Sequence, residues 1–320
     1  MARGLVERVL LASPRGYCAG VERAVETVER ALDRFGAPVY VRKQIVHNAH
    51  VVRELEDRGA IFVDDEGEVP AGSRVVFSAH GVAPEVRASA ARRRLATIDA
   101  TCPLVAKVHA QARHYAAAGY TIVLIGHAGH EEVVGTMGEA PEATVLVESV
   151  DDVEALELAP GTKLAYITQT TLSVDETAGI VAALRERFPH VHAPAKEGIC
   201  YATSNRQWSV KKLLEQIDLL LVIGSTNSSN SNRLVEVARA AGVDAYLIED
   251  ESAIEEAWLA GRSVVGLTSG ASAPERLVAR VCDWFRARGV GCFEQLATVR
   301  EDVAFKLPAE LRRPAATNAA

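Results

Sequence analysis

Short apolar runs and amphipathic stretches alternate along most of the chain. The runs that begin at Val39, Thr121 and Leu219 are aliphatic and have the length of strands. The stretch before the first of these runs has helical spacing instead, and its apolar face consists of Val21, Val25, Val28, Leu32 and Phe35. Strands that alternate with helices predict parallel sheets joined by right-handed crossovers. We therefore expect an α/β fold.

Three stretches of the chain share one plan. Each starts with a cysteine at the beginning of an amphipathic helix, and these cysteines are Cys18, Cys102 and Cys200. A strand and a polar loop follow each helix, and a second strand then begins at a closely matched distance from the cysteine, at Ile61, Thr144 and Tyr246. Internal similarity of this kind predicts repeated structural units. We expect three similar α/β units arranged with pseudo-threefold symmetry.

The repeat also predicts how the chain divides. We expect three α/β domains, at residues 15–100, 101–198 and 199–300. The opening strand, within residues 1–14, is expected to join the third sheet. A fourth strand is expected to deliver the next cysteine, as IDATC does for Cys102 and VHAPAKEGIC for Cys200. Residues 301–320 form a C-terminal tail, and its end after Leu311 is expected to be disordered because it is rich in Pro, Ala, Thr and Asn.

Polar residues are concentrated in the loops that follow the strands. Taken singly, each suits an ordinary turn or helix N-cap. Ligands of parallel sheets bind at the carboxyl ends of the strands, so three units around one axis would bring these loops and the cysteines to a central cavity. Together the loops offer many hydrogen-bond donors and few fixed charges, which suits a diphosphate. The candidate residues are His47, His80, His130, Thr170, Ser228, Ser229, Asn230 and Ser272.

Composition narrows the possible functions. The chain has 320 residues, 48% of them hydrophobic, and a formal net charge of -7. This charge argues against binding of nucleic acid, which needs a basic surface. No apolar run is long enough for a transmembrane helix. The apolar stretch at the N-terminus is interrupted by Glu7 and Arg8, so it resembles a strand and not a signal peptide, and we expect a cytoplasmic protein.

The five cysteines do not suggest a disulfide framework. A helix N-terminus stabilises a thiolate, which is the form of cysteine that binds metals. Thiolates bind zinc, copper(I) or iron-sulfur clusters, and the long separations between Cys18, Cys102 and Cys200 do not decide among them. A structural zinc site would need a fourth ligand, whereas three thiolates leave one iron of a four-iron cluster open to substrate. Cys282 and Cys292 lie outside the repeat and are interpreted as packing residues.

Nine motifs in order along the chain carry a family resemblance. They are PRGYCAGVERA, QIVHN, FSAHGV, DATCPLVAKVH, GHAGHEEVVGTMGE, ITQTTLSVDET, ICYATSNRQ, NSSNSNRL and LTSGASAPE, and an EDVAFKLP stretch follows them. In these motifs the chain resembles the 4-hydroxy-3-methylbut-2-enyl diphosphate reductase family, also known as IspH or LytB. The resemblance covers nearly the whole chain from about Arg15.

This resemblance implies an iron-sulfur oxidoreductase. Its reaction would be the last step of the methylerythritol phosphate pathway, a reductive dehydroxylation that yields isopentenyl and dimethylallyl diphosphates. The resemblance further implies a central 4Fe-4S cluster on Cys18, Cys102 and Cys200, which becomes 3Fe-4S when the open iron is lost. The motif histidines and the NSSN and GASAP residues would bind or surround the diphosphate. Glu132 and Thr170 would act near the substrate hydroxyl.

The chemistry explains why an acid and an external electron donor are needed. Cleavage of a carbon-oxygen bond releases hydroxide unless an acid protonates it, and Glu132 is the candidate, with Thr170 and His130 as its partners. No convincing GxGxxG motif follows a strand to bind a nicotinamide, so reduced ferredoxin or flavodoxin is the expected donor. Glu131 stands where the family commonly has proline. Successive residues of an extended loop point apart, so we expect only one of the two carboxylates to reach the substrate.

Two alternatives remain open on the sequence. The first is a zinc hydrolase of a phosphorylated substrate, with three thiolates and an activated water. The second is a non-catalytic protein that binds diphosphates between its α/β domains, for which the cysteines would be dispensable.

Overall fold

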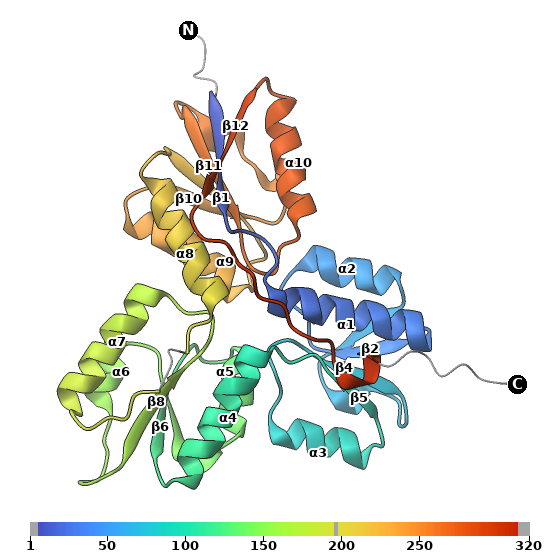
Figure 1. Ribbon diagram of the computed structural model, residues 1–320, viewed down its shortest axis with the longest axis vertical. Coiled ribbons are helices and arrows are strands. Elements are labelled where there is room, and N and C mark those ends of the chain that lie inside the picture. The colour runs from blue at the N-terminus through green and yellow to red at the C-terminus, as the bar shows by residue number, and fades with distance from the viewer. Residues whose placement is uncertain (1–5, 195–197, 313–320) are drawn as a thin grey trace, which may run out of the picture.

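A computed structural model describes residues 6–194 and 198–312. The chain forms three lobes around a common centre, each with its own parallel sheet and covering helices (Figure 1). This confirms the α/β fold with three parallel sheets. We propose that the three lobes are the domains at residues 15–100, 101–198 and 199–300. No helix in the described part of the chain is long and apolar enough to cross a membrane.

The first lobe has the strand order β3-β2-β4-β5. Its strands are β2 (Val39–Arg42), β3 (Ala60–Val63), β4 (Arg74–Phe77) and β5 (Ala96–Asp99), and its helices are α1 (Ala19–Phe35), α2 (Ala49–Asp57) and α3 (Pro84–Arg92). Four residues of the apolar stripe of α1 pack in the core as its spacing predicts, and Val28 lies there with Val39 and Val41. Phe35, at the end of the helix, is exposed instead. Gly36 ends this helix with φ of 77°, a conformation that favours glycine.

The second lobe has the strand order β7-β6-β8. Its strands are β6 (Thr121–Ile125), β7 (Thr144–Val147) and β8 (Leu164–Thr168), and its helices are α4 (Pro103–Ala117), α5 (Glu131–Gly138), α6 (Val150–Ala155) and α7 (Val174–Arg187). The fourth strand expected before Cys200 is wrong for the residues that the structure describes, since His192 makes only an isolated bridge to Ala165. Pro194 follows, and its lack of an N–H prevents the ladder from continuing there.

The third lobe has the strand order β10-β9-β11-β1-β12, with all pairs parallel. Its strands are β1 (Arg8–Ser13), β9 (Leu219–Ile223), β10 (Asp244–Ile248), β11 (Val264–Ser269) and β12 (Cys292–Ala297), and its helices are α8 (Tyr201–Leu214), α9 (Ser229–Ala240) and α10 (Glu275–Arg286). Cys282 is buried on α10, as expected of a packing residue. The same interpretation is wrong for Cys292, which is exposed because it begins the edge strand β12.

Short 3₁₀ helices complete the lobes at Glu66–Glu68, Pro141–Ala143, Glu251–Ala253 and Glu256–Leu259. After β12 the chain leaves the third lobe and crosses the centre to α11 (Ala309–Arg312) beside the first lobe (Figure 1). Leu311 is buried there in the core that α1 and β2 also form. The C-terminal tail thus contacts the rest of the protein up to residue 312, and the end expected to be disordered, residues 313–320, lies outside the described residues.

Candidate active site where the three lobes meet

One cavity lies where the carboxyl ends of the three sheets converge. It brings together every residue that the sequence singled out as a candidate for the site: Cys18, Cys102, Cys200, His47, His80, His130, Glu132, Thr170, Ser228, Ser229, Asn230 and Ser272. The lobes contribute one cysteine each. The site is therefore complete only at their junction, as the threefold repeat predicts.

The cysteines occupy equivalent positions, because Cys18, Cys102 and Cys200 are the N-cap residues of α1, α4 and α8. Burial raises the pKa of Cys102 to about 12 and that of Cys200 to about 11, and repulsion from Cys18 adds to both shifts. Three thiolates in this place would therefore need a positive partner. Gly20 packs against two of these thiols, since a Cβ at this position would stand 2.7 Å from the Cys102 Sγ and 3.8 Å from the Cys18 Sγ.

The three thiols line one cavity. Within residues 6–194 and 198–312, no three His, Cys, Asp or Glu side chains are grouped closely enough to hold a single metal ion. A lone zinc would need all its ligand atoms about 2.0–2.3 Å from one point. All three cysteines line the same cavity as Gly20, and a set of three thiolates would suit an iron-sulfur cluster.

Three histidines form one wall of the cavity. His47 and His80 follow β2 and β4, and their rings stack with centroids 4.0 Å apart. His130 meets both rings edge-on, at 5.6 Å and 5.9 Å. Burial lowers the pKa of His47 to about 2 and the pKa values of His80 and His130 to about 4. At neutral pH the imidazoles are therefore neutral hydrogen-bonding groups.

The two adjacent glutamates differ in their surroundings. Glu131 and Glu132 are the first two residues of α5, so the expectation that they lie in an extended loop is wrong. His130 is the N-cap, and its Nδ1 accepts a hydrogen bond from the Glu132 amide at 3.2 Å. Glu131 Oε2 lies 3.4 Å from His80 Nδ1. Of the two carboxylates, only Glu132 lines the cavity.

Glu132 is held in the cavity by Thr170. Its side chain is buried, with the residue 2% exposed. The Thr170 amide donates to Oε1 at 2.6 Å, and the Thr170 hydroxyl donates to Oε2 at 2.9 Å. Burial raises the pKa of Glu132 to about 7, although both hydrogen bonds from Thr170 oppose this shift. A carboxyl with this pKa can donate a proton near neutral pH.

The third lobe contributes a helix N-terminus and hydroxyl groups. Ser228 is the N-cap of α9, and its hydroxyl lies 3.4 Å from that of Ser272. Ser272 in turn donates to the His47 carbonyl at 2.9 Å and so connects the first and third lobes. Asn230 accepts from the Ala271 amide at 2.8 Å. A helix N-terminus lined by such donors is a common site for phosphate groups.

Ser229 and three further residues also line the cavity. The Ser229 hydroxyl donates to the Thr171 carbonyl at 3.0 Å, so it connects the second and third lobes. Tyr201, Thr203 and Phe305 also line the cavity but were assigned no role from the sequence. Phe305 belongs to the EDVAFKLP stretch, and this motif was the one signal that could have identified it.

Comparisons with known proteins agree with this site. Residues 9–286 match the model of the LytB protein family. The 4-hydroxy-3-methylbut-2-enyl diphosphate reductase of Acidothermus cellulolyticus is 58% identical, over 96% of this chain and 90% of its own length. The one from Streptomyces avermitilis is 56% identical, over 98% of this chain and 93% of its own length.

Solved structures give the same result. The E-1-hydroxy-2-methyl-but-2-enyl-4-diphosphate reductase of Plasmodium falciparum superposes with a TM-score of 0.93 and 40% identity, over 96% of this chain and 97% of its own. A second structure, of an (E)-4-hydroxy-3-methyl-but-2-enyl diphosphate reductase, has a TM-score of 0.63 and 31% identity, over 88% of this chain and all of its own. These matches confirm the resemblance seen in the motifs: the chain belongs to the LytB protein family of 4-hydroxy-3-methylbut-2-enyl diphosphate reductases.

Proposed function

We propose that the chain catalyses the reductive dehydroxylation of 4-hydroxy-3-methylbut-2-enyl diphosphate, the terminal step of the non-mevalonate pathway. The products are isopentenyl diphosphate and dimethylallyl diphosphate. The observation that carries the proposal is the presence of three thiols and the buried Glu132 in one cavity. Two electrons and two protons replace the C–O bond of the allylic alcohol by a C–H bond and release water, so the site needs both a redox group and a proton donor.

The redox group that we propose is a 4Fe-4S cluster held by Cys18, Cys102 and Cys200, with one iron left without a protein ligand. Loss of that iron would leave a 3Fe-4S form. When bound, the cluster supplies electrons and a Lewis-acidic metal next to the substrate. The set of three thiols in one cavity supports this assignment, because a structural zinc site needs four ligands whereas three thiolates leave one iron of a four-iron cluster open.

The substrate's diphosphate has suitable partners on two walls of the cavity. We assign its binding to the imidazoles of the histidine wall and to the N-terminus of α9. Neutral imidazoles donate one N–H each, and the amides and hydroxyls at the start of α9 add further donors. The assigned residues are His47, His80, His130, Ser228, Ser229, Asn230 and Ser272.

Glu132 is the proton donor in this proposal. With a pKa raised to about 7, its carboxyl still carries a proton in a large fraction of molecules at neutral pH. Thr170 holds both carboxyl oxygens, which fixes the direction in which the proton is presented. The carboxyl gives this proton to the departing hydroxyl, which leaves as water. His130 fixes the start of α5 and thereby the position of Glu132.

Electrons must come from outside the chain one at a time. We propose reduced ferredoxin or flavodoxin as the donor, and the cytoplasm as the place where they meet.

Anaerobic purification with iron and sulfide analysis tests the function. We expect a coloured protein with acid-labile sulfide, and we expect Cys102→Ser to lose both colour and turnover. Cys292→Ser is the matched control, because Cys292 is exposed and far from the repeat positions, and it should keep both. A colourless Cys102→Ser protein with full activity would contradict the proposal. A zinc-containing wild type without sulfide would favour a hydrolase instead.

A further inference from the structure

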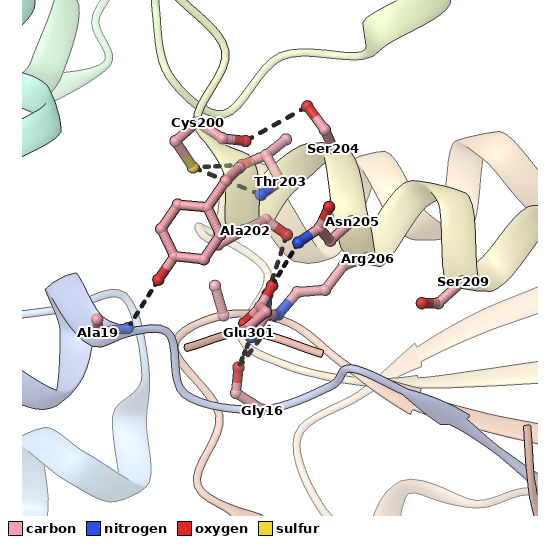
Figure 2. A network of polar contacts seen from close by, with 12 residues as sticks. Gly16, Ala19, Cys200, Ala202, Thr203, Ser204, Asn205, Arg206, Ser209 and Glu301 are labelled. Atoms are coloured by element: carbon pink, nitrogen blue, oxygen red, sulfur yellow. Dashed lines mark hydrogen bonds and ion pairs between the residues drawn. The ribbon is translucent and has the colours of Figure 1, made fainter. Parts of the chain in front are cut away.

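Arg206 on α8 is 0% exposed and is directed at the backbone just before Cys18. Its Nε and Nη2 donate to the Gly16 carbonyl at 3.2 Å and 2.7 Å, and Nη2 also donates to the Tyr17 carbonyl at 3.3 Å. Nη1 donates to the carbonyl of Ala202, two residues after Cys200, at 3.0 Å (Figure 2). One guanidinium therefore joins the segments that carry two of the three cysteines.

Arg23 makes a similar connection between the first lobe and the segment that carries Cys102. It lies on α1, the helix that Cys18 begins, and its Nη1 donates to the carbonyls of Ala100 and Thr101 at 2.9 Å and 3.0 Å. These are the two residues before Cys102. Thus α1, which follows Cys18, binds the backbone just before Cys102. In the same way α8, which follows Cys200, binds the backbone just before Cys18. The corresponding position on α4 is Lys107, whose side chain is exposed.

The C-terminal segment, defined as residues 298–308, supports both arginines. Glu301 pairs with the Arg206 Nη1 at 3.1 Å and also accepts from Asn205 at 3.0 Å (Figure 2). Further along, the Lys306 carbonyl accepts from the Arg23 Nε at 2.8 Å. This segment is the connection that crosses the centre from β12 to α11 in Figure 1.

A buried guanidinium is costly unless its donors are all used and its charge is paired. Arg206 meets both conditions, with main-chain carbonyls and Glu301 as its partners. The planar group presents its donors in fixed directions, so it fixes the relative position of the carbonyls that accept from it. Groups that orient ligand-bearing segments commonly change metal affinity strongly when removed.

We propose that Arg206 and Arg23 are positioning residues that set the places of Cys18 and Cys102, and that the C-terminal segment braces them through Glu301 and Lys306. This inference rests on the proposed cluster. It assigns a function to the chain after β12, which the repeat of helices and strands does not explain.

The test replaces the buried ion pair without leaving an unpaired charge. Apolar replacement of a buried pair is often neutral or stabilising, so the double variant Arg206→Met/Glu301→Met can keep its fold while losing the bonds to Gly16. The matched control, Lys212→Met/Arg300→Met, changes the same helix and the same segment at side chains that are 41% and 88% exposed. All proteins are reconstituted anaerobically with iron and sulfide.

Three readouts are compared with those of the wild type: thermal unfolding, the rate of iron release to a ferrous chelator, and deuterium exchange of the peptide 14–20. We expect the Arg206→Met/Glu301→Met protein to unfold near the wild-type temperature, to release iron about 10–100-fold faster, and to exchange faster in this peptide. The control should match the wild type. Arg23→Met should give the same increase in iron release, with faster exchange before Cys102.

A folded double variant that releases iron at the wild-type rate would overturn the inference. So would faster iron release without any change in the exchange of the peptide 14–20, because positioning acts through that segment. Failure of the proposed function gives a different result. In that case the wild-type chain itself would hold no iron and sulfide after reconstitution.

Discussion

The substitution Glu132→Gln removes the acidic proton and leaves the rest of the site in place. A glutamine has the shape of the glutamate, so its Oε1 can still accept from the Thr170 amide, and its Nε2 can donate to the Thr170 hydroxyl. We expect cluster content and KM to stay near their wild-type values. The rate constant kcat should fall about 10²- to 10⁴-fold, the usual contribution of a general acid. This corresponds to ~3–5 kcal/mol of lost transition-state stabilisation.

The raised pKa of Glu132 predicts how stability and activity change with pH. The pKa of Glu132 is raised from an ordinary 4.5 to about 7, so the folded protein binds more protons than the unfolded chain between these values. The free energy of unfolding therefore decreases by ~3 kcal/mol for this group as the pH rises from 4.5 to about 7. Above this range the contribution of the group does not change further. The acid is protonated below pH 7, so activity should be steady there and fall about tenfold per pH unit above it.

Anaerobic oxidation of a reduced viologen, followed by absorbance, measures kcat/KM across this pH range. The wild type should show the alkaline decrease, and Glu132→Gln should be slow at every pH without it. Glu131→Gln is the matched control, because it removes the neighbouring carboxylate that faces His80 and should retain the decrease. The reasoning fails if Glu132→Gln stays within about threefold of the wild type. Loss of the alkaline decrease in Glu131→Gln alone would move the acid to that residue.

Two further substitutions test the cavity. Gly20→Ala would place a Cβ 2.7 Å from the Cys102 Sγ. We therefore expect the iron content per chain to drop sharply on reconstitution. Full iron content would show that the cluster does not need a glycine at this position. Thr170→Val keeps the amide bond to Glu132 but removes the hydroxyl bond that lowers its pKa. The alkaline decrease in kcat/KM should therefore move to higher pH, and a decrease at the wild-type pH would refute this role of the hydroxyl.

The parts of this structure that follow local patterns could be predicted from the sequence. Apolar spacing and the matched distances from each cysteine predicted the helices, the parallel strands and the convergence of Cys18, Cys102 and Cys200 on one cavity. The helices and strands depend on residues that are near one another in the chain, and the convergence of the cysteines was inferred from the threefold repeat. The geometry of parallel sheets then places the loops at a common edge.

Contacts between distant residues could not be predicted in this way. The edge strand β12 pairs with β1, from the opposite end of the chain, and the pattern gave no sign of it. The strand expected before Cys200 is reduced to the bridge at His192, because Pro194 cannot donate to the ladder. Glu131 begins a helix capped by His130, and histidine is not among the residues usual at an N-cap.

The difference between local contacts and contacts of distant residues also explains why Arg206 and Arg23 matter more than their burial alone suggests. The His109–Glu139 pair is also buried, at 2.8 Å, but it joins α4 to α5 within the second lobe. This ion pair joins two helices of the same lobe. Arg206 bonds to Gly16, 190 residues away, across the junction where the thiols meet. Because each lobe supplies one thiol, the separation of the thiols is set by contacts of this second kind, and these are the contacts that no local pattern reveals.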